Sequence, residues 1–312
     1  MPQYRNLLPQ LDGRAFLTDG GLETTLVFHE GLELPCFAAF PLVCTEEGRT
    51  TLTQYFQPYL GLARKYGLGL ILDTPTWRAN PDWGRQLGFD AQALANVDRA
   101  AIDYLKELRR QHSHGGLPLV LNGVIGPRGD GYRIETTMTA AEAAMYHAPQ
   151  VQAFRDSEAD MVSAVTMTSA EETIGIAHAA KAADMPIVVS FTVETDGQLP
   201  SGQALGSAIE EADAVTGAYP AYYMINCAHP THFEHVLVGD AGWLGRIRGL
   251  RANASRKSHA ELDAASELDI GEPQELGQDY ARLCARLPNL RVFGGCCGTD
   301  HRHLTAICDA CL

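Results

Sequence analysis

The sequence lacks long apolar runs and carries little positive charge. No stretch approaches the roughly 18 uninterrupted apolar residues that a membrane-spanning helix needs. Lys and Arg together number 24 against 38 Asp and Glu, which gives the 312 residues a net charge of −14. Nucleic acids and anionic membranes are bound by basic patches, so this composition argues against both as partners.

Signals for secretion and for nucleotide binding are missing as well. Residues 1–12 contain no apolar core of a signal peptide, and neither G-x-G-x-x-G nor G-x-x-x-x-G-K-[ST] occurs. Eight cysteines in a chain without a secretion signal are typical of reduced thiols or metal ligands rather than of a disulfide framework. We therefore expect a cytoplasmic protein without a dinucleotide site or a P-loop.

What the sequence does contain is an alternation of short apolar runs with longer helix-like stretches. The apolar runs predict strands at residues 15–18, 68–73, 117–124, 161–167, 186–193, 221–226, 247–252 and 291–294. Helices are expected at residues 51–66, 91–111, 140–159, 170–183, 201–213, 230–237, 273–287 and 301–310. Nearly continuous apolar runs are typical of strands buried on both faces, and eight βα units favour an α/β fold, a closed (β/α)8 TIM barrel, over an open doubly wound sheet. No linker or repeat interrupts the pattern, so residues 1–312 are expected to form a single domain.

Polar and sulfur-bearing residues follow several of these predicted strands. In α/β barrels the chemistry gathers at the carboxyl ends of the strands. The residues that come just after strand candidates are Asp19, Thr74, Cys227, Asn253, Cys296 and Cys297. Their common placement predicts one shared site, and the glycine-rich segment 126–132 is expected to form a loop over the mouth of the barrel.

Cys296 and Cys297 are adjacent, and glycines flank them straight after the last predicted strand. Successive side chains of a strand point to opposite faces, so both sulfurs can serve one site only where the chain turns, which the glycines permit. Cys227 follows another predicted strand and is the candidate third ligand. Three sulfurs on Zn²⁺ with the fourth position open describe a catalytic site that could bind a substrate thiol. The alternative is a tight turn whose thiols pack as small hydrophobic groups.

Three histidines recur after Cys227 and form a rival set of metal ligands. We expect His229, His232 and His235 to form an exposed polar face beside the site, and the functional alternative is that they support the metal centre or contact the substrate. The other cysteines, including the Cys308 and Cys311 pair near the C-terminus, are expected to be structural.

A short glycine-containing segment, Asp19-Gly20-Gly21, follows the first predicted strand. The glycines indicate either a close approach of the backbone to a ligand or a tight turn. The Asp19 carboxylate either binds a substrate ammonium group or caps the following helix.

Taken together, Asp19-Gly20-Gly21, Asn226-Cys227 and the Gly-Gly-Cys-Cys-Gly segment at 294–298 resemble the homocysteine S-methyltransferase family, and the likeness extends over essentially the whole chain. The resemblance implies a (β/α)8 barrel enzyme that forms methionine, with Zn²⁺ on Cys227, Cys296 and Cys297. It also implies that Asp19 helps to hold the amino group of homocysteine. The substrate contacts expected with it are Gly20, Gly21, Thr74 and Asn226.

One position departs from the family pattern. The family usually has a glutamate at the end of the fourth strand that also holds the substrate amine, and Val165 stands there in this sequence. The departure leaves the three cysteines untouched but bears on the identity of the acceptor. Two alternatives therefore stay open, a zinc-dependent methyltransferase for another thiol or selenol and a non-catalytic thiol- or zinc-binding protein.

The expected methyl donor is a sulfonium, S-methylmethionine or S-adenosylmethionine, with betaine as an alternative, because the chain has no room for separate folate and cobalamin domains. A metal-bound thiolate would attack the methyl carbon, and the donor would leave as a neutral thioether. An acidic mouth with aromatic walls suits such a cation, and Phe28, Trp77 and Tyr132 are the candidate walls.

Overall fold

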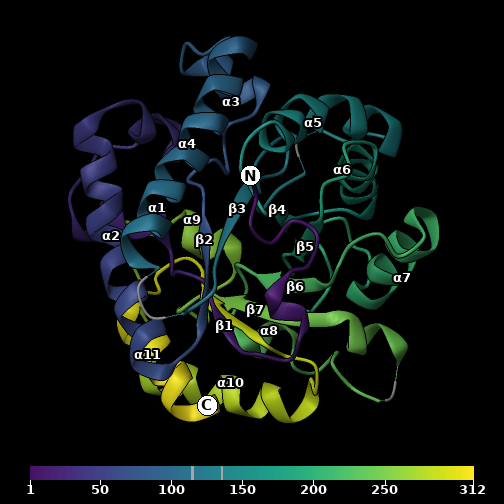
Figure 1. The fold of residues 1–312 in the computed structure, drawn as a ribbon. Coiled ribbons are helices and arrows are strands. Elements are labelled where there is room, and N and C mark those ends of the chain that lie inside the picture. Colours follow the sequence, from purple (N-terminus) through teal and green to yellow (C-terminus); the bar gives the residue numbers. More distant parts are fainter. Residues whose placement is uncertain (114–115, 135, 240) are drawn as a thin grey trace.

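Each of the eight predicted apolar runs forms a strand in the computed structural model, which describes residues 1–113, 116–134, 136–239 and 241–312. The strands are β1 Phe16–Leu17, β2 Gly69–Asp73, β3 Leu119–Ile125, β4 Met161–Met167, β5 Ile187–Phe191, β6 Tyr223–Asn226, β7 Ile247–Ala252 and β8 Val292–Gly295. Neighbouring strands are parallel, and β1 pairs with β8 to close the barrel (Figure 1). The predicted α/β class and (β/α)8 TIM barrel are confirmed.

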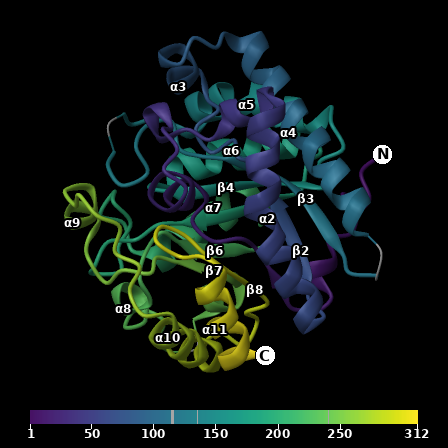
Figure 2. The ribbon, with the colours of Figure 1, turned by 90° about the vertical axis from the view of Figure 1, so that its left-hand side faces the viewer.

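Helices connect the strands and surround them on the outside (Figure 1). They are α1 Leu22–Thr24, α2 Glu46–Tyr66, α3 Pro81–Gln86, α4 Ala91–His112, α5 Ala140–Arg155, α6 Ala170–Ala182, α7 Leu205–Thr216, α8 Pro230–Phe233, α9 His259–Asp263, α10 Pro273–Arg286 and α11 His301–Cys311. The last helix, α11, packs against α10 and also touches α2 (Figure 2). Within the described ranges, no helix is both long enough and apolar enough to cross a membrane.

Three predicted helices begin or end more than one residue inside the expected range. The helix expected at 140–159 ends as α5 at Arg155. The helix expected at 230–237 ends as α8 at Phe233, and the Arg286 guanidinium donates to the Glu234 carbonyl that a longer helix would use. The helix expected at 201–213 begins only at Leu205 as α7, since the chain first turns through Gly202, whose φ is 79°. The sequence predicts neither α3 nor α9.

Apolar side chains fill the barrel near the amino-terminal ends of the strands. They form a buried cluster separate from the larger one that packs the strands against the helices. Its members include Leu8, Phe16, Ile71, Val120, Met161, Val188, Met224 and Val292. Because this cluster fills the amino-terminal end of the barrel, the functional site is expected at the carboxyl ends of the strands, as is usual in α/β barrels.

Candidate metal centre and its cavity

The three predicted ligand cysteines meet at the carboxyl end of the barrel. Cys227 follows β6, Cys296 and Cys297 follow β8, and their three Sγ atoms all lie within 4.8 Å of one another. Over the part of the chain that the structure describes, this is the one group of three or more side chains with metal-binding spacing. The structure therefore brings together the distant segments on which the predicted site depends.

Two of the three sulfurs are bonded to each other. Cys227 and Cys296 form a disulfide, with their Cα atoms 5.3 Å apart, whereas Cys297 is free. This bond differs from the reduced thiols that the sequence predicts. Its physical basis is that the turns after β6 and β8 bring the two Cα atoms within the usual span of a disulfide. Both sulfurs can become thiolate ligands only after the bond is reduced.

The end of β8 packs so closely against its neighbours that only glycine fits there. A Cβ on Gly294 would lie 1.8 Å from Thr18 Oγ1, and a Cβ on Gly295 would lie 2.0 Å from Thr299 Oγ1. The chain then turns through Gly298, whose φ is 77°. The glycines around the two adjacent cysteines thus set the direction in which the sulfurs leave the barrel.

Cys227 has a φ of 53°, in the left-handed region that residues other than glycine rarely occupy. Its carbonyl accepts hydrogen bonds from Asn253 Nδ2 at 3.0 Å and from His259 Nε2 at 2.7 Å. The preceding Asn226 side chain bonds to the backbone and hydroxyl of Thr166 at 2.9 and 2.8 Å. Backbone strain of this kind persists where the surroundings fix it, and it is typical of functional sites.

Tyr132 covers the third cysteine. Its hydroxyl lies 3.3 Å from Cys297 Sγ, and its ring stacks on His259 with 4.0 Å between ring centroids. Burial raises the pKa of the Cys297 thiol to about 11. In the absence of a metal ion this thiol is therefore protonated at neutral pH.

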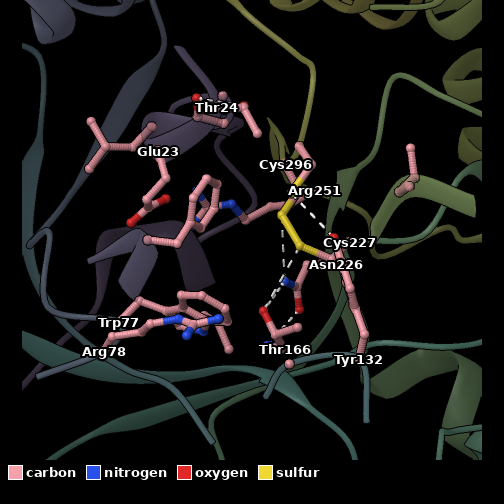
Figure 3. Close-up of a pocket in the computed structure, with 18 of the residues that line it drawn as sticks. Glu23, Thr24, Trp77, Arg78, Tyr132, Thr166, Asn226, Cys227, Arg251 and Cys296 are labelled. Carbon is pink, nitrogen blue, oxygen red and sulfur yellow. Dashed lines mark hydrogen bonds between the residues drawn. A yellow bond between two sulfur atoms is a disulfide. The ribbon is translucent and has the colours of Figure 1, made fainter. Parts of the chain in front are cut away.

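A cavity of about 420 Å³ opens beside the cysteines (Figure 3). The three predicted aromatic walls, Phe28, Trp77 and Tyr132, all line it, and so does Val165. Because Tyr132 belongs to the loop at 126–132, that loop lies at the mouth of the site as predicted. The cavity thus joins apolar walls to a sulfur-rich end.

The Asp19 carboxylate is buried and already has two partners. Arg251 donates to its Oδ1 at 2.5 Å, and the Tyr55 hydroxyl donates to its Oδ2 at 3.0 Å. Burial raises the pKa of Asp19 to about 7, and Arg251 acts in the opposite direction. The alternative role as a helix cap is not found, because α1 begins after Gly21. Asp19 lines the cavity but is occupied by protein groups.

The polar groups of Thr74 and Asn226, the other predicted substrate contacts with side chains, are also engaged. Both residues line the cavity. The Thr74 hydroxyl accepts from the Val124 N–H at 2.9 Å and lies 2.6 Å from Thr76 Oγ1. Asn226 forms its hydrogen bonds with Thr166 of β4. The polar groups of both side chains therefore hold neighbouring parts of the barrel together at the carboxyl ends of the strands.

Gly20 and Gly21 allow a close contact between the chain after β1 and the cysteine segment. A Cβ on Gly20 would lie 2.6 Å from the Thr299 carbonyl oxygen, and a Cβ on Gly21 would lie 2.5 Å from that of Cys296. The structure thus gives these glycines a role that differs from both sequence interpretations, the approach to a ligand and the tight turn: they let one backbone segment pack closely on another.

The three histidines belong neither to the sulfur cluster nor to the lining of the cavity, and two of them are buried rather than on the exposed face that the sequence predicts. His229 is 3% exposed, and burial lowers its pKa to about 3. The Nε2 atom of His232 lies 2.8 Å from the Arg256 carbonyl oxygen. Because that carbonyl can only accept, His232 carries its proton on Nε2. His235 is exposed as expected. His229 precedes α8 and His232 lies within it, and both are packed against other parts of the protein.

Sequence reasoning missed Arg251 and Glu23, which both line the cavity. Arg251 was detectable in principle, since an arginine at the end of a predicted barrel strand needs a partner once it is buried, although Arg248 in the same strand gives an identical signal. Glu23 carries no such signal, because a glutamate early in a helix is ordinary.

Comparisons with known proteins agree with this architecture. The sequence profile of the homocysteine S-methyltransferase family matches residues 16–311. Crystal structures of the homocysteine methyltransferase MmuM from Escherichia coli are similar in the oxidized form, with TM-score 0.73, 19% identity and coverage of 95% of this chain and 96% of that chain. The metallated form matches with TM-score 0.70 and 19% identity over 96% of this chain and 97% of that chain. The apo form matches with TM-score 0.65 and 18% identity over 95% of this chain and 96% of that chain. No curated protein sequence matches significantly.

At such identities the likeness to solved structures shows the fold alone, whereas the family profile spans nearly the entire sequence. The cysteine segments after β6 and β8 that carry the resemblance lie within the matched residues. The chain therefore belongs to the homocysteine S-methyltransferase family of enzymes.

Proposed function

We propose that this protein transfers a methyl group from a sulfonium donor to the thiol of homocysteine, with Zn²⁺ held by Cys227, Cys296 and Cys297. The observation that carries the proposal is the convergence of three sulfur atoms, all within 4.8 Å of one another, in the lining of the cavity. Family membership supports homocysteine as the acceptor.

The donor set fits zinc on chemical grounds. Three thiolates are soft ligands of a kind that zinc accepts in tetrahedral sites, with a fourth position left for a substrate. When bound, Zn²⁺ would keep a substrate thiol deprotonated at neutral pH, where a free thiol is mostly protonated. The Cys227–Cys296 disulfide has to be reduced before the set is complete.

The reaction needs few further groups from the chain. The thiolate sulfur of the acceptor forms a bond to the methyl carbon while the bond from that carbon to the donor sulfur breaks, and its electron pair stays on the donor. A thiolate and a sulfonium thus become two thioethers, so the transfer step itself moves no proton; the thiol proton of the acceptor is released to solvent earlier, when the acceptor binds as a thiolate. The cavity walls align the reactants and exclude water, which in favourable systems supplies roughly 7–11 kcal/mol of the barrier.

A second candidate acceptor is a different thiol or a selenol. Two observations favour it: Val165 lines the cavity where the family resemblance predicts an acid, and the Asp19 carboxylate is taken up by Arg251 and Tyr55. Neither residue offers a free carboxylate to a substrate amine in this structure.

The test is methionine formation from homocysteine and S-methylmethionine by the reduced, zinc-loaded protein, with and without chelator. We expect Cys297→Ser to lose both stoichiometric zinc and methyl transfer, since it removes one of three ligands but leaves the other two in place. Cys44→Ser, which changes an exposed free cysteine, is the matched control and should retain both. A Cys297→Ser protein with full zinc and full activity would contradict the ligand assignment, and turnover with another thiol alone would favour the second candidate.

A further inference from the structure

The acidic side chains that line the cavity are mostly paired with basic groups of the protein. Asp19 and Asp73 share Arg251, and Asp130 pairs with Arg78 at 3.4 Å. Nearer the surface, the acid–base pairs at the cavity are Asp263 with Arg133 and Asp269 with Lys257. Most of the negative charge around the cavity is therefore already compensated.

Glu23 and Glu267 are the described cavity acids without an ion pair. Glu267 is exposed to solvent, whereas Glu23 is half-buried. Burial raises the pKa of the Glu23 carboxyl above its ordinary value. The positive charges of Arg78 and Arg251 act in the opposite direction on this pKa, but neither guanidinium forms an ion pair with Glu23. A shielded carboxylate without a direct ion pair is unfavourable, and a cationic ligand in contact with it would relieve that penalty.

Glu23 lines the same cavity as the three cysteines. The next residue, Thr24, accepts at Oγ1 from the Gly298 N–H at 3.2 Å, so α1 is held against the cysteine segment. Figure 3 shows the Glu23 side chain reaching into the cavity from the side opposite the Cys227–Cys296 pair. A ligand between them would meet a sulfur on one side and a carboxylate on the other.

Aromatic rings complete this part of the cavity. Phe28, Phe37 and Trp77 line it, and a cation already rests on Trp77, since the Arg78 guanidinium carbon lies 4.9 Å from that ring's centroid. An ammonium group needs several hydrogen-bond acceptors, whereas a sulfonium has no N–H and is satisfied by a carboxylate and aromatic faces. The surroundings of Glu23 therefore fit a sulfonium better than an ammonium.

We propose that Glu23 holds the sulfonium cation of the methyl donor and so determines the class of donor that this protein accepts. This inference deepens the proposed function and rests on it for the identity of the donor. It assigns the cation to a residue of α1 rather than to Asp19, whose carboxylate belongs to the Arg251 pair.

The test compares S-methylmethionine with methionine as ligands of the reduced, zinc-loaded protein in the absence of acceptor, by titration calorimetry. The two molecules share their amino and carboxylate groups and differ in the methyl group and the positive charge on sulfur. We expect the wild type to prefer S-methylmethionine and Glu23→Gln to lower this preference about tenfold or more, as the loss of a shielded charge pair implies. Glu267→Gln is the matched control and should retain the wild-type preference.

Three results would overturn the proposal: a wild type without preference, a Glu23→Gln protein that keeps it, or an equal loss of affinity for both ligands, which would place Glu23 at the amino end. Zinc content and circular dichroism verify that the variant is folded, and Glu23→Asp, which keeps the charge on a shorter side chain, should recover part of the preference. Methyl transfer is measured separately. If the wild type binds S-methylmethionine selectively but transfers no methyl group, the proposed function is refuted and the role of Glu23 stands. If the wild type transfers the methyl group but Glu23→Gln keeps the wild-type preference for S-methylmethionine, the role of Glu23 is refuted and the proposed function stands.

Discussion

At the scale of single residues, the cysteines depend on side chains that the sequence pattern does not mark. Cys227 holds a left-handed backbone that its residue type does not favour, and the Asn253 and His259 hydrogen bonds to its carbonyl keep it there. Glycine content did indicate the turn around Cys296 and Cys297. The sequence could therefore predict which sulfurs meet, but not the strained turn or the disulfide that joins two of them.

Tyr132 is the side chain whose effect on the metal centre can be isolated most directly. Burial raises the pKa of its phenol well above the ordinary value, so the hydroxyl keeps its proton and can donate to a Cys297 thiolate at 3.3 Å. Tyr132→Phe removes this hydrogen bond but leaves the ring that stacks on His259. Partners of metal ligands typically contribute 10- to 100-fold to metal affinity, so we expect zinc affinity to fall by about tenfold or more.

Competition with a chromophoric chelator measures this affinity. Tyr66→Phe is the matched control, because the Tyr66 hydroxyl bonds to Asp309 at the surface. Equal zinc affinity in the Tyr132→Phe and wild-type proteins would show that the hydroxyl does not support Cys297.

At the scale of elements, apolar runs proved sufficient for the strands and insufficient for the loops. The strands were predictable because burial on both faces gives nearly continuous apolar runs, with β7 as the exception, since it carries Arg248 and Arg251. The end of α8 was not, since it depends on the Arg286 contact to the Glu234 carbonyl, which comes from a distant helix. The same dependence on distant contacts applies to Arg251, whose partners are Asp19 after β1 and Asp73 at the end of β2.

The helix α11 begins at His301, four residues after Cys297, and is capped by Asp300. The Asp300 carboxylate accepts from the Arg302 N–H at 2.9 Å and pairs with the Arg302 guanidinium. Loss of such a cap typically costs about 1 kcal/mol, so we expect Asp300→Ala to lower the free energy of unfolding by roughly that amount. Urea titration monitored by circular dichroism measures the change, and Asp300→Asn, which retains a capping oxygen, should lose less.

The same cap makes the difference in unfolding free energy between the wild type and Asp300→Ala dependent on pH. Burial acts to raise the pKa of Asp300, but hydrogen bonds with His303 and Arg302 outweigh it and hold the pKa well below its ordinary value of 3.8. A carboxyl with a depressed folded-state pKa stabilises the protein above its unfolded pKa, and this contribution is lost as the pH falls through the folded pKa. The gap in stability between wild type and Asp300→Ala should therefore narrow below about pH 4. A gap that stays constant or widens on acidification would contradict this account of the cap.

At the scale of the whole molecule, Arg251 ties three parts of the barrel together. It projects from β7 and pairs with Asp19 after β1 and with Asp73 at the end of β2, and all three side chains are at most 12% exposed. Burial acts to lower the pKa of Arg251, but the two carboxylates outweigh it and raise the pKa. In a chain with a net charge of −14, this single cation is the shared ion-pair partner of two buried acids.

Removing this cation should affect the stability of the entire barrel. Arg251→Met leaves two buried carboxylates without their counter-ion, and breaking a buried pair in this way typically costs about 3–5 kcal/mol. The urea midpoint of unfolding should therefore fall markedly. Arg133→Met is the matched control: Arg133 is 67% exposed and pairs with Asp263 at the surface, so its loss should change the free energy of unfolding by less than about 1 kcal/mol.

A triple variant separates lost attraction from stranded charge. Asp19→Asn and Asp73→Asn combined with Arg251→Met remove all three charges, and replacing a complete buried ion network with neutral groups is often nearly neutral for stability. We expect the triple variant to recover most of the stability that Arg251→Met loses. If it is instead as unstable as the single variant, the cost lies in the packing and hydrogen bonds of the Arg251 side chain, and the network does not act through charge.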